Sequence, residues 1–258
     1  MSEEYIPTED VKMVEQDVIW EDGQPPRYKI KIPDFLARWD VWQVWEKERF
    51  LSMEEKLKPG DVLFDIGVES GWMAAIHGQF VGPQNVCLFE SSPEFWTHIR
   101  AVWEANFDQL PAATCACLVS DQTKGTLELR PNFYASIWPP VAYRLNIIDT
   151  LKYRKYRYLH EHTHEIPQIS IDDFVGQSQI HPKAIAMDVE GAELRVLQGA
   201  RSTLQYDRPL VWLSAHPDLL EKDYGTTQEE LGEFMYHANY ALKHLATDHE
   251  VHLFFEPL

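Results

Sequence analysis

Three carboxylates fall close together in the segment DVEGAE, at Asp188, Glu190 and Glu193. They follow the apolar run over 183–189, which has the length and composition of a buried strand. Unpaired charges are too costly to bury, so these side chains are expected to face a ligand, a metal ion or each other. Acids also favour the first turn of a helix, which explains Glu193 well and Asp188 poorly.

A glycine-bearing turn occurs earlier in the chain, in the segment DIGVESG. Asp65, Gly67 and Gly71 have the spacing D-x-G-x-x-x-G, with Glu69 between the two glycines. Gly67 allows a sharp turn and Gly71 allows the next helix to pack closely, and both leave room for a ligand against bare backbone. A pyrophosphate cradle has the spacing G-x-G-x-x-G, so S-adenosylmethionine is favoured here over a dinucleotide. The alternative is a tight turn without a ligand.

Polar residues also follow the next two apolar runs. Glu90 lies about 20 residues beyond Gly67, where an acid can accept hydrogen bonds from ribose hydroxyls. The alternative is an acid that only begins a loop. Ser120 and Asp121 follow the run over 113–119 and are assigned to the adenine amino group by position alone.

A histidine follows the fifth apolar run. His216 has the intrinsic pKa of a general base that could take a proton from a hydroxyl acceptor. Asp188 is the rival for that role, and a lone histidine is often only a structural hydrogen-bonding group.

These residues require a regular scaffold to bring them together. Short apolar runs alternate with amphipathic helical patterns, which indicates an α/β fold with a parallel sheet covered on both faces. Ligands of such sheets bind at the carboxyl ends of the strands. The strands are expected at 61–66, 85–89, 113–119, 183–189, 209–214, 240–244 and 251–255, with a small extra strand at 125–129. The helices are expected at 39–57, at 72–80, from Ser92 and Pro93 onward, from about 194 to 204, and at 227–241.

The chain divides into an acidic N-terminal arm, 1–45, and a catalytic domain, 46–258. The arm is expected to lie over the domain or to be partly disordered, because it is acidic and interrupted by prolines. An insertion over 131–166 separates the third and fourth strands and is expected to bind the acceptor.

The segment KAIAMDVEGAELRVLQGA resembles the signature segment of the FkbM-type methyltransferases. LKPGDVLFDIGVESGW and VCLFESSPEFW are similar to the glycine turn and the strand-two acid of that family, and IPQISIDDF is similar to its lead-in to the signature. The resemblance covers residues from about 45 to 258. It is most specific at the signature.

The resemblance implies a Rossmann-like class I methyltransferase fold with a mostly parallel seven-stranded sheet and helices on both faces. It also implies S-adenosylmethionine as cofactor and O-methylation of a hydroxyl on a small-molecule or saccharide acceptor. Asp65, Gly67 and Gly71 would hold the methionine end and Glu90 the ribose, while Asp188 and Glu190 would line the reaction centre. The donor site also includes Glu69, Ser120, Asp121 and Asp188, and the catalytic residues are His216, Asp188 and Glu190.

Two positions depart from the family pattern. Glu69 stands where the family usually has asparagine, and Ser214 stands where it often has a glutamate two residues before the histidine. The first departure concerns the donor site and the second the catalytic assignment.

Charge and composition narrow the possible partners. The chain has 23 basic and 41 acidic residues and a formal net charge of −18, which disfavours nucleic acids and anionic membranes as partners. No apolar run reaches the roughly 18 residues that a membrane span needs, and the acidic first residues do not predict a signal peptide. Cys87, Cys115 and Cys117 lie in apolar runs without metal-type spacing, which favours a reducing compartment, the cytoplasm.

The insertion contains two further candidate features. Lysines and arginines alternate with tyrosines over 145–158, which would suit an acceptor carrying phosphate or carboxylate, or else forms a solvated surface. His160, His162 and His164 could share one face and bind a metal, but a solvated loop is favoured and no metal site is assigned.

Two other functions stay open at this point. One is a nucleotide or nucleic-acid methyltransferase, and the other is a catalytically silent binding protein with a methyltransferase fold. A homo-oligomer is compatible with the sequence.

Overall fold

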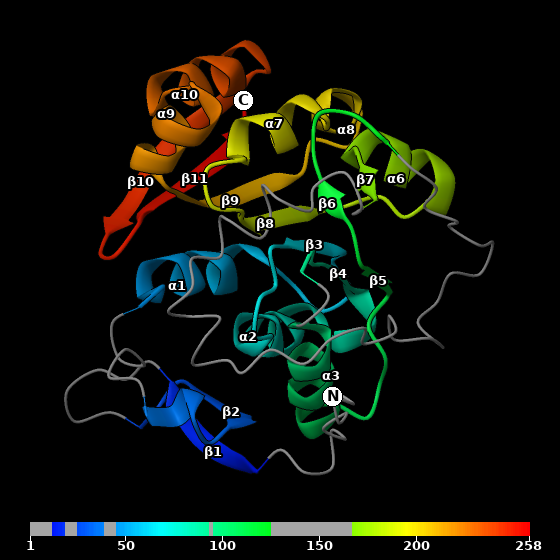
Figure 1. Ribbon diagram of the computed structural model, residues 1–258, viewed down its shortest axis with the longest axis vertical. Helices are drawn as coiled ribbons and strands as arrows, with labels where there is room; N and C mark the ends of the chain where they lie inside the picture. Colours follow the sequence, from blue (N-terminus) through cyan, green and yellow to red (C-terminus); the bar gives the residue numbers. More distant parts are fainter. Residues whose placement is uncertain (1–11, 19–24, 39–44, 93–94, 125–166) are drawn as a thin grey trace, which may run out of the picture.

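The computed structural model describes residues 12–18, 25–38, 45–92, 95–124 and 167–258 of the chain (Figure 1). Its centre is a seven-stranded sheet in the order β10-β11-β9-β8-β3-β4-β5. Its pairings are parallel except those that β11 makes with β9 and β10, so the predicted mostly parallel seven-stranded α/β sheet is confirmed. The strands are β3 (Leu63–Ile66), β4 (Val86–Phe89), β5 (Ala113–Cys115), β8 (Ala184–Asp188), β9 (Leu210–Ala215), β10 (Tyr240–Thr247) and β11 (Val251–Pro257).

Four neighbouring strands end at the same edge of this sheet. Ile66 of β3 pairs with Phe89 of β4 and with Met187 of β8. Asp188, the last residue of β8, pairs with Ser214 of β9. The carboxyl ends of β3, β4, β8 and β9 therefore lie in one row, which is where open parallel sheets bind ligands.

Helices cover both faces of the sheet (Figure 1). Alternate strand residues face opposite ways, so Leu63 packs in the core beneath one layer of helices and Phe64 in the core beneath the other. In the described parts of the chain, no helix is both long enough and apolar enough to span a bilayer. One layer has α1 (Lys47–Lys56), α2 (Trp72–Val81) and α3 (Trp96–Asn106), and the other has α6 (Ile171–Ser178), α7 (Glu193–Gln198), α8 (Arg201–Tyr206), α9 (Pro217–Tyr224) and α10 (Gln228–His237).

An antiparallel hairpin precedes the sheet, formed by β1 (Met13–Val18) and β2 (Tyr28–Pro33). Ile30 and Ile32 are buried in the same core as α2 and α3. Asn106 at the end of α3 accepts from the Lys31 N–H (2.8 Å) and donates to the Lys31 carbonyl (2.7 Å). The described part of the predicted N-terminal arm is therefore a folded hairpin that shares a core with the domain.

Two predicted elements differ in extent. The helix expected over 39–57 begins only at Lys47, because Glu46 has a left-handed φ of 60° that a continuing helix does not contain; residues 39–44 lie outside the described residues. The strand expected over 113–119 is divided: β6 (Leu118–Val119) leaves the main sheet and pairs in parallel with β7 (Gln168–Ile169). The division occurs where the Cys117 N–H donates to the Cys115 carbonyl in a tight turn. The extra strand expected at 125–129 also lies outside the described residues.

Helix boundaries differ at two further places. The N-cap of α3 is Phe95, not Ser92 as predicted. The helix expected after the fourth strand is interrupted between Gln198 and Arg201. At this break Gly199 passes so close to the Ser120 carbonyl oxygen that an added Cβ would lie 2.1 Å from it. A capping box between Thr227 and Glu230 forms the start of α10, where a helix was expected from residue 227.

Candidate active site

The turn after β3 brings three loops together. Gly67 has a φ of 82°, and a side chain on it would lie 1.8 Å from the Asp188 carbonyl oxygen. The backbone N–H of Gly67 also donates to the Phe89 carbonyl at the end of β4 (2.9 Å). A ligand was expected in the space beside the Gly67 Cα. That space is instead filled by the main chain at the end of β8. Gly67 is needed for this close approach of the loops.

Gly71 acts on the helix layer. Its φ is 86°, and an added side chain would lie 3.0 Å from the Ile99 Cα of α3. This contact agrees with the expectation that Gly71 allows a close packing of helices. Glu69, between the two glycines, has a φ of 51°, which asparagine tolerates better than glutamate.

Glu90 lies at the end of β4 and holds the glycine turn. Its Oε2 accepts from the backbone N–H of Glu69 (2.9 Å), and its Oε1 accepts from that of Ser92 (2.7 Å). The residue is 7% exposed. These two bonds fix the carboxylate against the glycine turn.

Asp65 is directed into the helix layer. Its Oδ2 lies 2.8 Å from Nδ1 of His77, a fully buried residue of α2. The carboxylate that was expected to hold a methionine end is therefore already engaged by an imidazole through one of its oxygens.

Ser120 and Asp121 follow β6, away from the row of strand ends. Ser120 is buried and its backbone N–H donates to the Ile169 carbonyl (3.0 Å). Its hydroxyl donates to Asp121 (3.0 Å), whereas Asp121 is exposed.

His216, just after β9, lies among the carboxylates of the β8 turn. Its Nε2 is 3.6 Å from Asp188 Oδ1 and 3.3 Å from Glu190 Oε2, and its Nδ1 is 3.1 Å from Glu193 Oε1. Glu250, in the turn between β10 and β11, adds a fourth carboxylate 3.0 Å from Nε2. The structure thus brings together the three residues predicted as catalytic.

The charges in this group shift two pKa values. Burial favours the neutral ring of His216, but the carboxylates of Glu193, Glu250 and Asp188 outweigh burial and raise its pKa to about 11. Burial favours the protonated form of Glu250, but His216 outweighs it and lowers the pKa of Glu250 to about 2. At neutral pH both nitrogens of the His216 ring are therefore protonated when the protein has no ligand bound.

A second buried polar group lies beside the first. Arg49 of α1 donates to Glu46 Oε2 (2.8 Å) and to the Ser214 hydroxyl (2.9 Å), and all three residues are at most 2% exposed. The same hydroxyl donates to Glu46 Oε1 (3.2 Å) and lies 3.1 Å from His252 Nδ1. At Ser214, the position that departs from the family pattern, a carboxylate is present but comes from Glu46.

Arg49 carries its charge in this interior. Burial alone lowers the pKa of Arg49, but Glu46, Asp188 and Asp65 outweigh burial and raise it. The guanidinium therefore balances part of the negative charge behind the strand ends.

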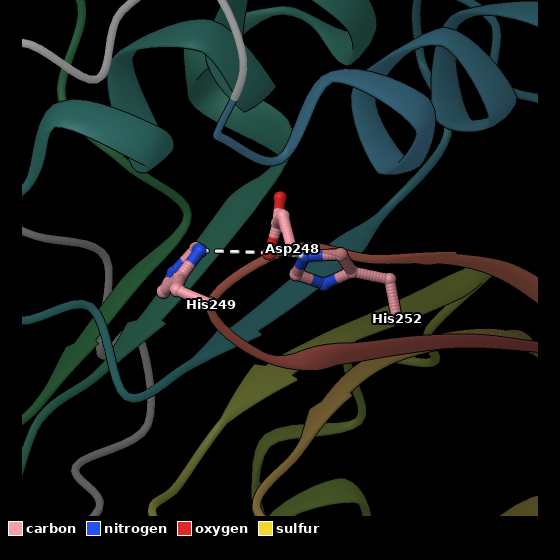
Figure 2. A group of neighbouring side chains, drawn as sticks. All are labelled: Asp248, His249 and His252. Carbon is pink, nitrogen blue, oxygen red and sulfur yellow. Dashed lines mark hydrogen bonds and ion pairs between the residues drawn. The ribbon is translucent and has the colours of Figure 1, made fainter.

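The turn between β10 and β11 contributes a third group, shown in Figure 2. His249 Nδ1 and His252 Nε2 each lie 2.7 Å from Asp248 Oδ1. His249 stacks on Trp45, with ring centroids 4.0 Å apart. Two imidazoles that share one carboxylate lower the pKa of Asp248 in spite of its burial.

Several residues of the site were not predicted from sequence. Glu250 and His252 lie in or beside the turn between two predicted strands, so their position at a strand end was a usable signal. Glu46 and Arg49 carry no motif, because their partner Ser214 is more than 160 residues away in the chain. The insertion over 131–166, the basic-aromatic stretch 145–158, and His160, His162 and His164 lie outside the described residues.

A model of the methyltransferase FkbM domain matches residues 65–254, which is well over half of the chain. The chain belongs to the FkbM methyltransferase family. The match begins at Asp65 in β3 and ends at Phe254 in β11, so it spans the main sheet and the candidate active site. Membership of the FkbM family and the strand order confirm the class I methyltransferase fold and support a methyltransferase function.

The solved structures that are similar include an FkbM methyltransferase from Methylobacillus flagellatus, with 18% identity and a TM-score of 0.48; the match covers 78% of this chain and 44% of that one. The chain thus spans less than half of that protein. A precorrin-6y C5,15-methyltransferase from Geobacter metallireducens has 10% identity and a TM-score of 0.43, with 83% and 89% of the two chains covered. Fibrillarin from Aeropyrum pernix, with natively bound S-adenosyl-L-methionine, has 12% identity and a TM-score of 0.41, with 95% and 99% covered. No curated protein matches the sequence.

Proposed function

We propose that this FkbM-family protein is a cytoplasmic S-adenosylmethionine-dependent O-methyltransferase that acts on a hydroxyl of a small-molecule or saccharide acceptor. The observation that carries the proposal is the position of Glu90. Its carboxylate lies at the end of β4 against the glycine turn, held there by two backbone N–H groups. An acid in that position can accept from both ribose hydroxyls of the donor.

The donor site of this proposal comprises Asp65, Gly67, Glu69, Gly71, Glu90, Ser120, Asp121 and Asp188. Glu90 is the group that contacts the donor ribose. Asp65 supports the donor site indirectly, because its Oδ2 lies 2.8 Å from Nδ1 of His77. Gly67 and Gly71 set the approach of the loops and the helices.

The reaction needs little covalent chemistry from the protein. S-adenosylmethionine supplies, when bound, a methyl group on a sulfonium that is already a good leaving group. The residues at the strand ends align the acceptor hydroxyl for in-line attack and take its proton. Both nitrogens of His216 are protonated at neutral pH when no ligand is bound, so His216 cannot take the proton in that state. Asp188 is then the base, and His216 and Glu190 orient the acceptor.

The donor site is tested by calorimetry with S-adenosylhomocysteine. Glu90→Ala removes the ribose acceptor and is expected to weaken binding by about 1–3 kcal/mol. Glu104→Ala is the matched control and should bind like the wild type, because Glu104 lies on the exposed side of α3 and, within the described ranges, pairs with Arg100 alone. Equal affinity of folded Glu90→Ala and the wild type would remove Glu90 from the site.

The acceptor class is tested with the same protein by following methyl transfer to a panel of saccharides and small alcohols. A methylated hydroxyl in one of them is the expected product. Binding of adenosylhomocysteine without transfer to any hydroxyl would favour the nucleotide acceptor or the silent binding protein. Absence of adenosylhomocysteine binding by the wild type would overturn the proposed donor.

A further inference from the structure

The protonated ring of His216 has two N–H groups but four carboxylate neighbours. Asp188 and Glu190 come from the β8 turn, Glu193 from the first turn of α7, and Glu250 from the β10–β11 turn. Four carboxylates from three parts of the chain therefore surround one imidazole. The four ring-facing oxygens lie 3.0–3.6 Å from its two nitrogens.

The two ring nitrogens have different surroundings. Among the described residues, Nδ1 meets Glu193 alone, whose side chain is fully buried and also accepts from the Gly191 N–H (3.0 Å). Nε2 faces the oxygens of Asp188, Glu190 and Glu250. A buried carboxylate that holds one nitrogen of the ring is the usual support of a metal-binding histidine.

Nε2 does not point at any one of its three oxygen neighbours. Within the described part of the chain it makes no hydrogen bond of normal geometry, although the oxygen of Glu250 is only 3.0 Å away. Each oxygen therefore lies to the side of the N–H direction. The His216 side chain is nine-tenths buried.

The distances fit ligands of a common ion. Two ligand atoms that are each about 2.1 Å from an ion lie about 3.0 Å apart at an octahedral angle and about 3.4 Å apart at a tetrahedral angle. The separations from Nε2 are 3.3 Å to Glu190 and 3.6 Å to Asp188. Asp188, Glu190 and His216 each present one ligand atom within 4.8 Å of the others, and Glu250 does not belong to this group.

We propose that His216, Asp188 and Glu190 bind a divalent cation, with Glu193 as the positioning residue that orients the ring. One imidazole nitrogen with carboxylate oxygens is a donor set for a first-row ion such as Mn²⁺. The side chains of Asp188 and Glu190 are 14% and 15% exposed, so an ion can reach them from the open ends of the strands. If the proposed function holds, the ion lies where the acceptor hydroxyl is expected and can lower the pKa of that hydroxyl.

The neighbouring group in Figure 2 does not require an ion. Its two imidazoles reach the same oxygen of Asp248 at 2.7 Å, which is hydrogen-bond distance, and so already satisfy it. Because His249 Nε2 also lies 3.5 Å from Glu250 Oε1, the histidine control is His181 instead, an exposed ring that lies 2.8 Å from Asp207.

The test is a titration of the full chain, stripped with a chelator, with Mn²⁺ alone, followed by electron paramagnetic resonance of free Mn²⁺. The wild type is expected to bind one ion. His216→Gln, Glu190→Gln and Glu193→Gln are each expected to weaken that binding by at least about tenfold. Asp218→Asn and His181→Gln are expected to leave it unchanged; Asp218 is an exposed acid in the next turn of chain, and His181 is an exposed histidine paired with Asp207.

The proposal fails if the wild type binds no stoichiometric Mn²⁺, or if His216→Gln binds Mn²⁺ as tightly as His181→Gln does. Glu190→Gln keeps the test decisive if His216→Gln does not fold, because Glu190 is at the partly exposed side of the group. Adenosylhomocysteine calorimetry on the same samples separates the two proposals. Mn²⁺ binding without adenosylhomocysteine binding supports the cation site and overturns the proposed function.

Discussion

Replacement of Gly67 should lower the stability of the fold even when no ligand is present. A Cβ at this position would meet the Asp188 carbonyl oxygen at 1.8 Å, and the φ of 82° is itself unfavourable for alanine. Main-chain atoms cannot move aside as a flexible side chain does. Gly67→Ala is therefore expected to lower the free energy of unfolding by more than about 3 kcal/mol, measured by urea denaturation.

Gly176 provides the matched control for that measurement. It lies on the exposed side of α6, has no positive φ, and has no atom within 4 Å of an added Cβ. Gly176→Ala should raise the free energy of unfolding by about 0.5–1 kcal/mol, because alanine is favoured inside a helix. Equal stabilities of the two variants would show that the loops at Gly67 and Asp188 can separate without cost.

Position after a strand was the signal that located site residues from sequence. It identified Asp188, Glu190 and His216, which the structure brings together. It said less about side-chain direction, since Asp65 is at a strand end but turns toward His77. The pair of Glu46 and Arg49 gave no local signal, because its burial depends on Ser214 in a distant strand.

Among the elements, the N-terminal hairpin was missed although it has a period-two pattern. Tyr28, Ile30 and Ile32 alternate with Lys29 and Lys31, which is typical of a strand with one buried face. The charge and prolines of the surrounding arm obscured that signal. The inner strands of the main sheet were predicted because they are short continuous apolar runs, which are typical of a parallel sheet covered on both faces.

The hairpin should unfold together with the domain because it shares a core with α2 and α3. Ile30→Ala removes a side chain that is 1% exposed and should cost about 2–5 kcal/mol. A single urea transition, shifted to lower denaturant with an unchanged slope, is the expected result. Lys29→Ala, on the exposed side of the same strand, should shift that transition little.

Two separate transitions, with only the first shifted by Ile30→Ala, would contradict a shared core. The hairpin would then be a lid that opens independently of the sheet.

At the scale of the whole molecule, the net charge of −18 bears on the nucleic-acid alternative. Long-range repulsion from polyphosphate is expected to outweigh any local basic stretch, and phosphate contacts would be seen as a steep salt dependence. Fluorescence anisotropy with a labelled RNA should therefore show no saturable binding at 50 mM or at 200 mM salt. Saturable binding that weakens between those two concentrations would instead support the nucleic-acid acceptor.

The main-chain contact between the β3 turn and the β8 turn has a consequence for the energetics of ligand binding. The first loop also hydrogen-bonds to the end of β4, beside Glu90, and the second bears Asp188 and Glu190. A ligand that shifts one loop must shift the other, so occupancy at the two places is thermodynamically linked. If the bound methyl donor changes the affinity of the acidic group for its ligand by some factor, that ligand, once bound, must change the affinity for the donor by the same factor.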